Sequence, residues 1–185
     1  MSYCTYIASD YPLEPKKNPH DITMSVNEAL AMGIKDIPEH YLAPEFDKDE
    51  PDVMLYSDRD IEINTETREI KDGDHDDDYA LYPIEGFGDI YTEKKYAVYL
   101  EWMRYTEGRA KKVIEYIKEN LKHTDEVEIW HIFMGVGETP NIHTKKMSIE
   151  EFQPEMIRDI YNREIKIETV EGYEVADQYR YVITR

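Results

Sequence analysis

A strand, a helix and a second strand in direct succession between residues 96 and 134 constrain the fold more than any other feature. Residues 96–103, YAVYLEWM, are apolar on both faces of an extended chain, as in an interior strand. Thr106 is a good helix N-cap. Five apolar residues follow it at helical spacing: Ala110, Val113, Ile114, Ile117 and Leu121. EVEIWHIFMG at 126–135 then resumes strand character, so we predict a βαβ unit with parallel strands and a right-handed crossover.

Two Ser-x-x-Glu capping boxes, at Ser25 and Ser148, predict further helix starts. Gly33 stands where the first of these helices should stop. Pro154 conflicts with a continuous second helix, because an interior proline removes a backbone donor. Either this helix kinks, or a one-turn piece ends and a second helix begins with Pro154 in its first turn.

The remaining segments with strand character alternate with turn-forming residues. They are residues 3–9, 53–57, 60–64, 79–84, 164–170 and 179–185. We therefore predict one α+β domain over residues 1–185, built on a mixed, largely antiparallel sheet. That sheet contains the βαβ unit of 96–134, two or three helices cover it, and a C-terminal β-hairpin closes it. The proline-rich, acidic stretch 34–52 is the one candidate boundary.

The charge is large and unevenly distributed. The chain has 41 acidic and 22 basic side chains, a net charge of −19. Residues 1–90 hold 23 acids and 7 bases, whereas residues 91–185 hold 18 and 15. Such a chain would repel nucleic acid and anionic membranes, so we expect neither as a partner. The charge serves solubility, or it provides an acidic face for a basic protein partner.

The compartment is predicted from what the sequence lacks. No apolar run approaches the roughly 20 residues that span a bilayer, and the first residues do not resemble a signal peptide. Cys4 is the only cysteine, so no intramolecular disulfide can form, and we interpret it as a small buried hydrophobe. We therefore expect a cytoplasmic protein.

Three segments carry a family resemblance: CTYIASDYPL at 4–13, YTEKKYAVYLEW at 91–102 and EVEIWHIFMG at 126–135. Together they resemble an uncharacterised family of small acidic bacterial proteins. The resemblance covers about a third of the chain. It implies a bacterial, cytoplasmic origin and brings no known activity.

The aspartate-rich run 71–78 is the candidate metal site. Asp72, Asp74 and Asp76 alternate like the first ligands of an EF-hand loop. The sixth loop position, however, is Asp77 instead of glycine, and the twelfth is Pro83 instead of glutamate. We therefore expect a solvated loop, with weak binding of a divalent cation as the alternative.

Two histidines are the candidate catalytic or binding residues. His131 lies within a predicted strand, and alternation places it on the face of Ile129 and Phe133. His143 is predicted on a loop at the carboxyl end of that strand, where α/β folds bind ligands, and Glu138 precedes it. The glycines of GVGET at 135–139 match no phosphate-binding loop, so no cofactor is expected.

The chain has sixteen tyrosines, and several recur on the predicted strands: Tyr79, Tyr82, Tyr96, Tyr99, Tyr179 and Tyr181. Tyrosine suits half-buried surfaces and protein interfaces, which favours a partner-binding face or self-association. The leading hypothesis is a non-catalytic interaction module, immunity- or inhibitor-like, whose acidic face binds a basic protein. The alternative is a small enzyme or ligand-binding domain with a pocket near His131 and His143.

Overall fold

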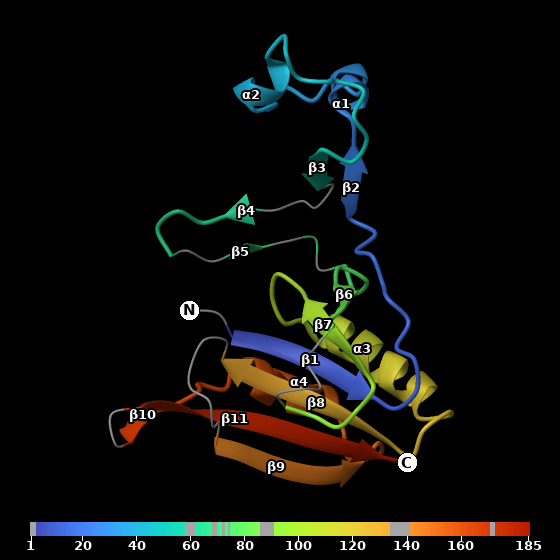
Figure 1. Ribbon diagram of the computed structural model, residues 1–185, viewed down its shortest axis with the longest axis vertical. Coiled ribbons are helices and arrows are strands. Elements are labelled where there is room, and N and C mark those ends of the chain that lie inside the picture. The colour runs from blue at the N-terminus through green and yellow to red at the C-terminus, as the bar shows by residue number, and fades with distance from the viewer. Residues whose placement is uncertain are drawn as a thin grey trace. The chain divides into compact units, whose positions relative to one another are not determined.

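The computed structural model describes residues 3–57, 62–67, 70–71, 73, 75–85, 91–133, 141–170 and 173–185. The chain divides into two compact units. We call residues 1–18 with 74–185 the sheet unit and residues 19–73 the insert. The expectation of one domain over residues 1–185 stays a prediction, since this division does not decide it. Figure 1 labels the elements of both units.

Seven strands of the sheet unit form one mixed sheet within the described residues. They are β1 (Tyr3–Ser9), β6 (Ala80–Pro83), β7 (Tyr96–Glu101), β8 (Glu126–Phe133), β9 (Asn141–Ser148), β10 (Ile167–Val170) and β11 (Tyr173–Thr184). The order is β10-β11-β8-β1-β7-β6, and β9 pairs with β11. The β9–β11 pair is parallel and the others are antiparallel, which confirms a mixed, largely antiparallel sheet.

The predicted βαβ unit is present, and the N-terminal strand lies inside it. β1 pairs antiparallel with β7 on one side and with β8 on the other. β7 and β8 therefore run parallel, as expected, but are not neighbours. The C-terminal hairpin is also confirmed, because β10 and β11 pair antiparallel.

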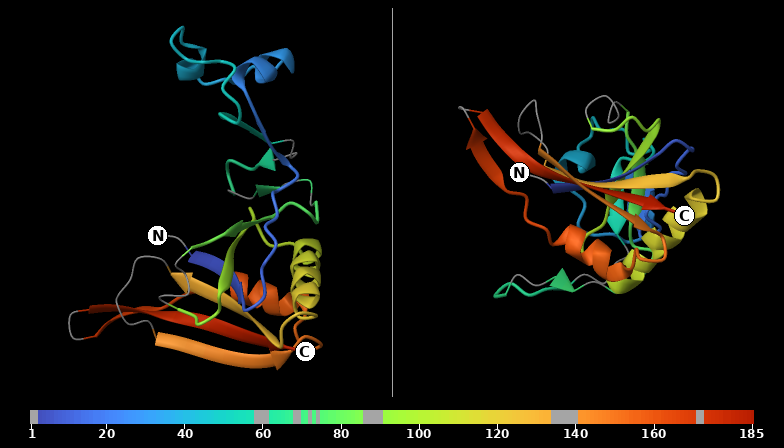
Figure 2. Two further views of the ribbon diagram at one scale, coloured as in Figure 1. Left: turned by 45° about the vertical axis from the view of Figure 1, so that its right-hand side comes forward. Right: turned by 90° about the horizontal axis from the view of Figure 1, so that it is seen from below.

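Two helices cover one face of the sheet, α3 (Glu107–Asn120) and α4 (Pro154–Tyr161). Thr106 caps α3 by accepting a hydrogen bond from the backbone N–H of Arg109. Pro154 occupies the first turn of α4, so the second of the two expected arrangements is found. Figure 2 shows both helices on the same side of the strands. Their apolar residues share one core with Ile7, Ile129 and other side chains of that face.

The two chain segments that flank the insert are joined within the sheet unit. Lys16 and Leu81 exchange two backbone hydrogen bonds of 3.0 and 2.8 Å. Beside them, Asn18 Nδ2 donates to Asp78 Oδ1 at 2.6 Å, and Arg109 Nη2 lies 2.9 Å from Asp78 Oδ2. Asp78 and Arg109 are both fully buried. The expectation that the whole aspartate run is solvated is therefore wrong at Asp78, because a buried guanidinium there balances its charge.

The insert has its own small core. Its elements are β2 (Asp21–Met24), α1 (Val26–Ala31), α2 (Glu39–Leu42), β3 (Met54–Ser57), β4 (Glu62–Ile63) and β5 (Ile70–Lys71). β2 pairs with β3 and β4 with β5, both antiparallel. The capping box of Ser25 and Glu28 is complete, with bonds of 3.2 and 2.7 Å. Gly33 follows α1 with a φ of 78°, as the predicted helix stop requires.

Among the helices that the structure describes, none is both long and apolar enough to span a bilayer.

Candidate functional site

The two candidate histidines lie in one row across three neighbouring strands. In the register, His131 of β8 is opposite Tyr179 of β11, which is in turn opposite His143 of β9. Residues paired in this way point to the same face of a sheet. His143 therefore lies within a strand, and its prediction on a loop was wrong. The parallel pairing of β9 with β11 makes this segment extended.

His131 is buried at one end of this row, on the face that the helices partly cover. Its Nε2 lies 3.1 Å from the carbonyl oxygen of Arg163, and its Nδ1 lies 3.5 Å from the hydroxyl of Thr5. Because a carbonyl oxygen only accepts, Nε2 carries the proton and Nδ1 is left as an acceptor. Burial is the largest cause that lowers the pKa of His131 below its ordinary 6.5, so the ring is neutral at pH 7.

A hollow of about 360 Å³ opens beside His131. Three aromatic side chains line it: Tyr3, Trp102 and Tyr161. Tyr99 also borders the hollow, but alternation along β7 turns its ring to the opposite face, against Tyr6. Thr5, Leu100 and His131 complete the lining. We call this the aromatic hollow. The ring of Tyr3 stacks on that of His131, with centroids 6.0 Å apart, which orients the imidazole from the open side.

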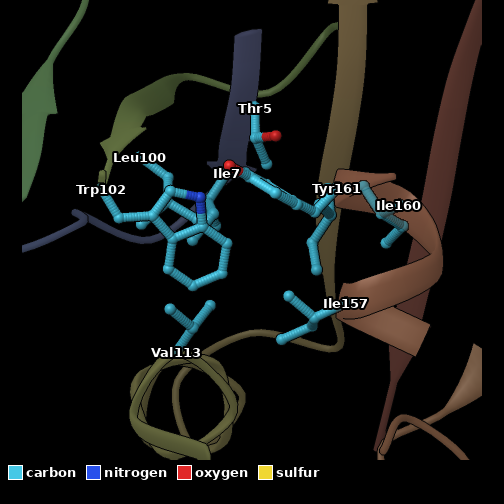
Figure 3. Close-up of a pocket in the computed structure, with 9 residues that line it drawn as sticks. Thr5, Ile7, Leu100, Trp102, Val113, Ile157, Ile160 and Tyr161 are labelled. Carbon is cyan, nitrogen blue, oxygen red and sulfur yellow. The ribbon is translucent and has the colours of Figure 1, made fainter. Parts of the chain in front are cut away.

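A small apolar void lies next to the aromatic hollow. Thr5, Leu100, Trp102 and Tyr161 line both spaces. The void measures about 10 Å³, the size of one water. Figure 3 shows Trp102 and Val113 on one side of it, with Ile157 and Tyr161 of α4 on the other. The ends of β7 and α4 thus leave the core incompletely filled under the aromatic hollow.

His143 belongs to a different pocket of about 360 Å³, which is lined by several charged side chains. We call this the basic pocket. Its lining includes Lys145, Arg163 and Lys166. The His143 Nε2 lies 2.9 Å from Asp177 Oδ1, and this hydrogen bond is the largest cause that lowers the pKa of Asp177. The structure therefore does not bring His131 and His143 together in one site, and Glu138 lies outside the described residues.

Of the three candidate metal ligands, the structure describes only Asp76. Asp72 and Asp74 lie outside the described residues. Asp76 is exposed, and its carboxylate lies directly against Gly108 in the first turn of α3. A negative charge is favourable there, near the helix N-terminus and close to Lys111. Within the described part of the chain, no group of three or more His, Cys, Asp or Glu side chains could hold a metal ion.

Sequence reasoning missed most of the residues that line the two spaces. Trp102 directly follows β7 and Tyr161 ends α4, and only the tertiary packing brings their rings together, 5.8 Å apart. Arg163 lies over the ring of Tyr179, 4.7 Å from its centroid. The one available signal was the excess of tyrosine. The strand tyrosines do not share one environment, however, since Tyr181 is buried and Tyr96 is exposed.

No protein-family model, curated protein or solved structure matches the chain. The resemblance to small acidic bacterial proteins therefore stays a prediction, as do a bacterial origin and a cytoplasmic location. Arguments about function depend on the geometry of this chain alone.

Proposed function

We propose that the protein is a ligand-binding domain that holds a small aromatic molecule with one hydrogen-bond donor in the aromatic hollow. The observation that carries this proposal is a hollow with aromatic walls and a single buried, neutral imidazole. Apolar pockets of a few hundred Å³ with few polar groups are typical of small-molecule sites.

The lining determines the class of ligand. Tyr3, Trp102 and Tyr161 offer ring faces and edges, which favour a planar apolar ligand. His131 Nδ1 is an acceptor, and its partner in the structure is the hydroxyl of Thr5 at 3.5 Å, a long bond that a ligand donor can replace. A phenol, or another ring bearing an O–H or N–H, can therefore donate to Nδ1. Among the residues that the structure describes, no cation lines this hollow, so an anionic ligand is not favoured.

The test compares phenol with toluene, which has the same shape but no donor. Binding is followed by tryptophan fluorescence, since Trp102 lines the hollow while Trp130 is buried on the opposite face of the sheet. We expect saturable binding of phenol, weaker binding of toluene, and shifts of the amide NMR signals of Thr5 and Trp102. Unsaturable responses to both compounds would contradict the proposal.

Two variants with matched controls locate the site. His131→Phe keeps a ring but removes the acceptor, so it should abolish the preference for phenol; His123→Phe, on a histidine outside this lining, should retain it. Trp102→Ala should weaken the binding of both phenol and toluene. Tyr96→Ala, on the same stretch of chain but outside the lining, should leave the affinity for both unchanged. Equal effects of a variant and its control would show that the hollow is not the site.

A second candidate function is the binding of a basic protein by the insert. Residues 19–73 contain 15 acidic and 5 basic side chains, a difference of −10, which is more than half of the net charge of −19. The insert also exposes large apolar side chains, among them Leu55 at 66% and Met32 at 59%. Acidic charge beside exposed apolar groups suits a basic partner that carries apolar anchors.

This candidate is tested with a partner captured from lysate, purified and titrated against the protein. We expect its affinity to fall steeply with salt, because charge dominates the encounter. Leu55→Ser should weaken binding, whereas Ile142→Ser, an exposed apolar residue of β9 in the sheet unit, should not. Binding that is indifferent to both salt and Leu55→Ser would exclude the insert as the interface.

A further inference from the structure

The basic pocket is a second space, distinct from the aromatic hollow. It is formed by β9, by β11 and by the segment that follows α4. Its complete lining is His143, Thr144, Lys145, Arg163, Lys166, Asp177, Tyr179 and Tyr181. The carbonyl of Arg163 bonds to His131, so the chain itself crosses the sheet face at the point that separates the two spaces. A ligand of one therefore need not extend into the other.

The charge of this pocket is opposite to that of the whole protein. Lys145, Arg163 and Lys166 contribute three permanent cations, while Asp177 is the single carboxylate of the lining. Within the part of the chain that the structure describes, no ion pair joins any of the three cations to a carboxylate. Two positive charges therefore remain after Asp177 is counted, in a chain whose net charge is −19.

The carboxylate of Asp177 is already occupied by other groups. Its Oδ1 accepts from Asn141 Nδ2 at 2.7 Å and lies 2.9 Å from His143 Nε2. Arg163 is held by its position over the ring of Tyr179. The cations are thus arranged around a space rather than around the acid. Hydroxyl groups of Tyr179 and Tyr181, which share the strand face of His143 and Lys145, add neutral donors.

We infer that the basic pocket binds the phosphate group of a small molecule, or phosphate itself. A phosphate group carries about −1.5 to −2 charges at neutral pH and several acceptor oxygens, which matches the two excess positive charges and the donors. A volume of about 360 Å³ suits a small molecule. A polyanion such as nucleic acid is disfavoured, because the other charges of the chain would repel it. This site goes beyond the proposed function and does not depend on it.

Calorimetric titration with inorganic phosphate, against sodium chloride at equal ionic strength, tests the inference. We expect saturable binding of phosphate that chloride does not reproduce. Phenyl phosphate is titrated in parallel. If phenyl phosphate binds more tightly than phosphate, the ligand is a phosphorylated small molecule. If the two bind with equal affinity, the ligand is the free ion. Both outcomes support the site. A response to phosphate that does not saturate would overturn it.

Neighbouring lysines of β9 provide a matched control. Lys145 lines the pocket, whereas Lys146 is the next residue along the strand, points to the other face and lies 3.5 Å from Glu126. Lys145→Gln and Lys166→Gln should each weaken phosphate binding about threefold, and the double variant about tenfold. Lys146→Gln removes the same charge and should leave the affinity unchanged. Equal weakening by Lys145→Gln and Lys146→Gln would mean that only the general field acts, and the pocket would be rejected.

Discussion

Replacing Asp78 by asparagine tests the buried ion pair beside the insert. Arg109 is 0% exposed and Asp78 is 1% exposed, so solvent cannot compensate for the lost charge. In Asp78→Asn the guanidinium loses the charge of its carboxylate partner, while its hydrogen bonds to the carbonyls of His75 and Arg104 are neutral. The new amide also has a single acceptor oxygen for two donors, Arg109 and Asn18. Breaking a buried pair in this way costs about 3–5 kcal/mol of the free energy of unfolding.

Urea denaturation followed by circular dichroism measures this cost. With a slope of about 2 kcal/mol per molar urea, the midpoint of Asp78→Asn should fall by about 2 M. Glu119→Gln, in an exposed ion pair with Lys122, is the control and should change the stability by less than about 0.5 kcal/mol. Adding Arg109→Met to Asp78→Asn should restore part of the loss, because the buried charge is then gone. A loss below about 1 kcal/mol, or additive losses in the double variant, would refute the reasoning.

Three further predictions concern single residues. The pKa of His131 is lowered from its ordinary 6.5 in the folded chain. As the pH falls below about 6.5, the imidazole therefore takes up a proton in the unfolded chain but remains neutral in the folded chain. The free energy of unfolding should therefore decrease from about pH 7.5 to about pH 5.5, by at most about 1.4 kcal/mol per pH unit, and urea titrations should show a smaller decrease in His131→Gln. Gly33→Ala should cost about 1 kcal/mol in the same assay, since φ is 78° there, and an unchanged midpoint would contradict it. Thr106→Ala should cost about 1 kcal/mol through the lost cap of α3, whereas Thr124→Ala, outside any helix start, should cost less.

The elements of the sheet unit could be predicted because each depends on local signals. Thr106 and the apolar spacing after it determine α3, and the apolar run at 126–133 determines β8. The position of β1 between β7 and β8 could not be predicted, because strand order depends on contacts distant in sequence. The limits of the insert, after Asn18 and at Gly73, were also missed. The proline-rich stretch 34–52, which suggested a boundary, lies inside the insert.

The candidate site was predicted less well than the fold. Alternation placed His131 correctly with Ile129 on the helix-covered face. Its neighbours Trp102 and Tyr161 follow from the packing of β7 against α4, for which no local pattern exists. His143 was assigned to a loop because residues 141–148, NIHTKKMS, are mostly polar, and they form β9 only through pairing with β11. The burial of Asp78 depends on a single arginine 31 residues away along the chain.

Two backbone hydrogen bonds join Lys16 and Leu81, and the hydrogen bond of Asn18 to Asp78 lies beside them. This junction has a consequence for how the chain can be altered. The polypeptide leaves the sheet unit and returns to it at one junction, where hydrogen bonds join the outgoing and the returning segment. A segment attached in this way behaves as a cassette: it can be shortened, lengthened or exchanged while the strands on either side of the junction keep their register. The acidic surface of residues 19–73 and the two spaces around Tyr179 and His131 are therefore free to change independently of each other in evolution. The same junction is where an engineer would cut to obtain the sheet unit alone.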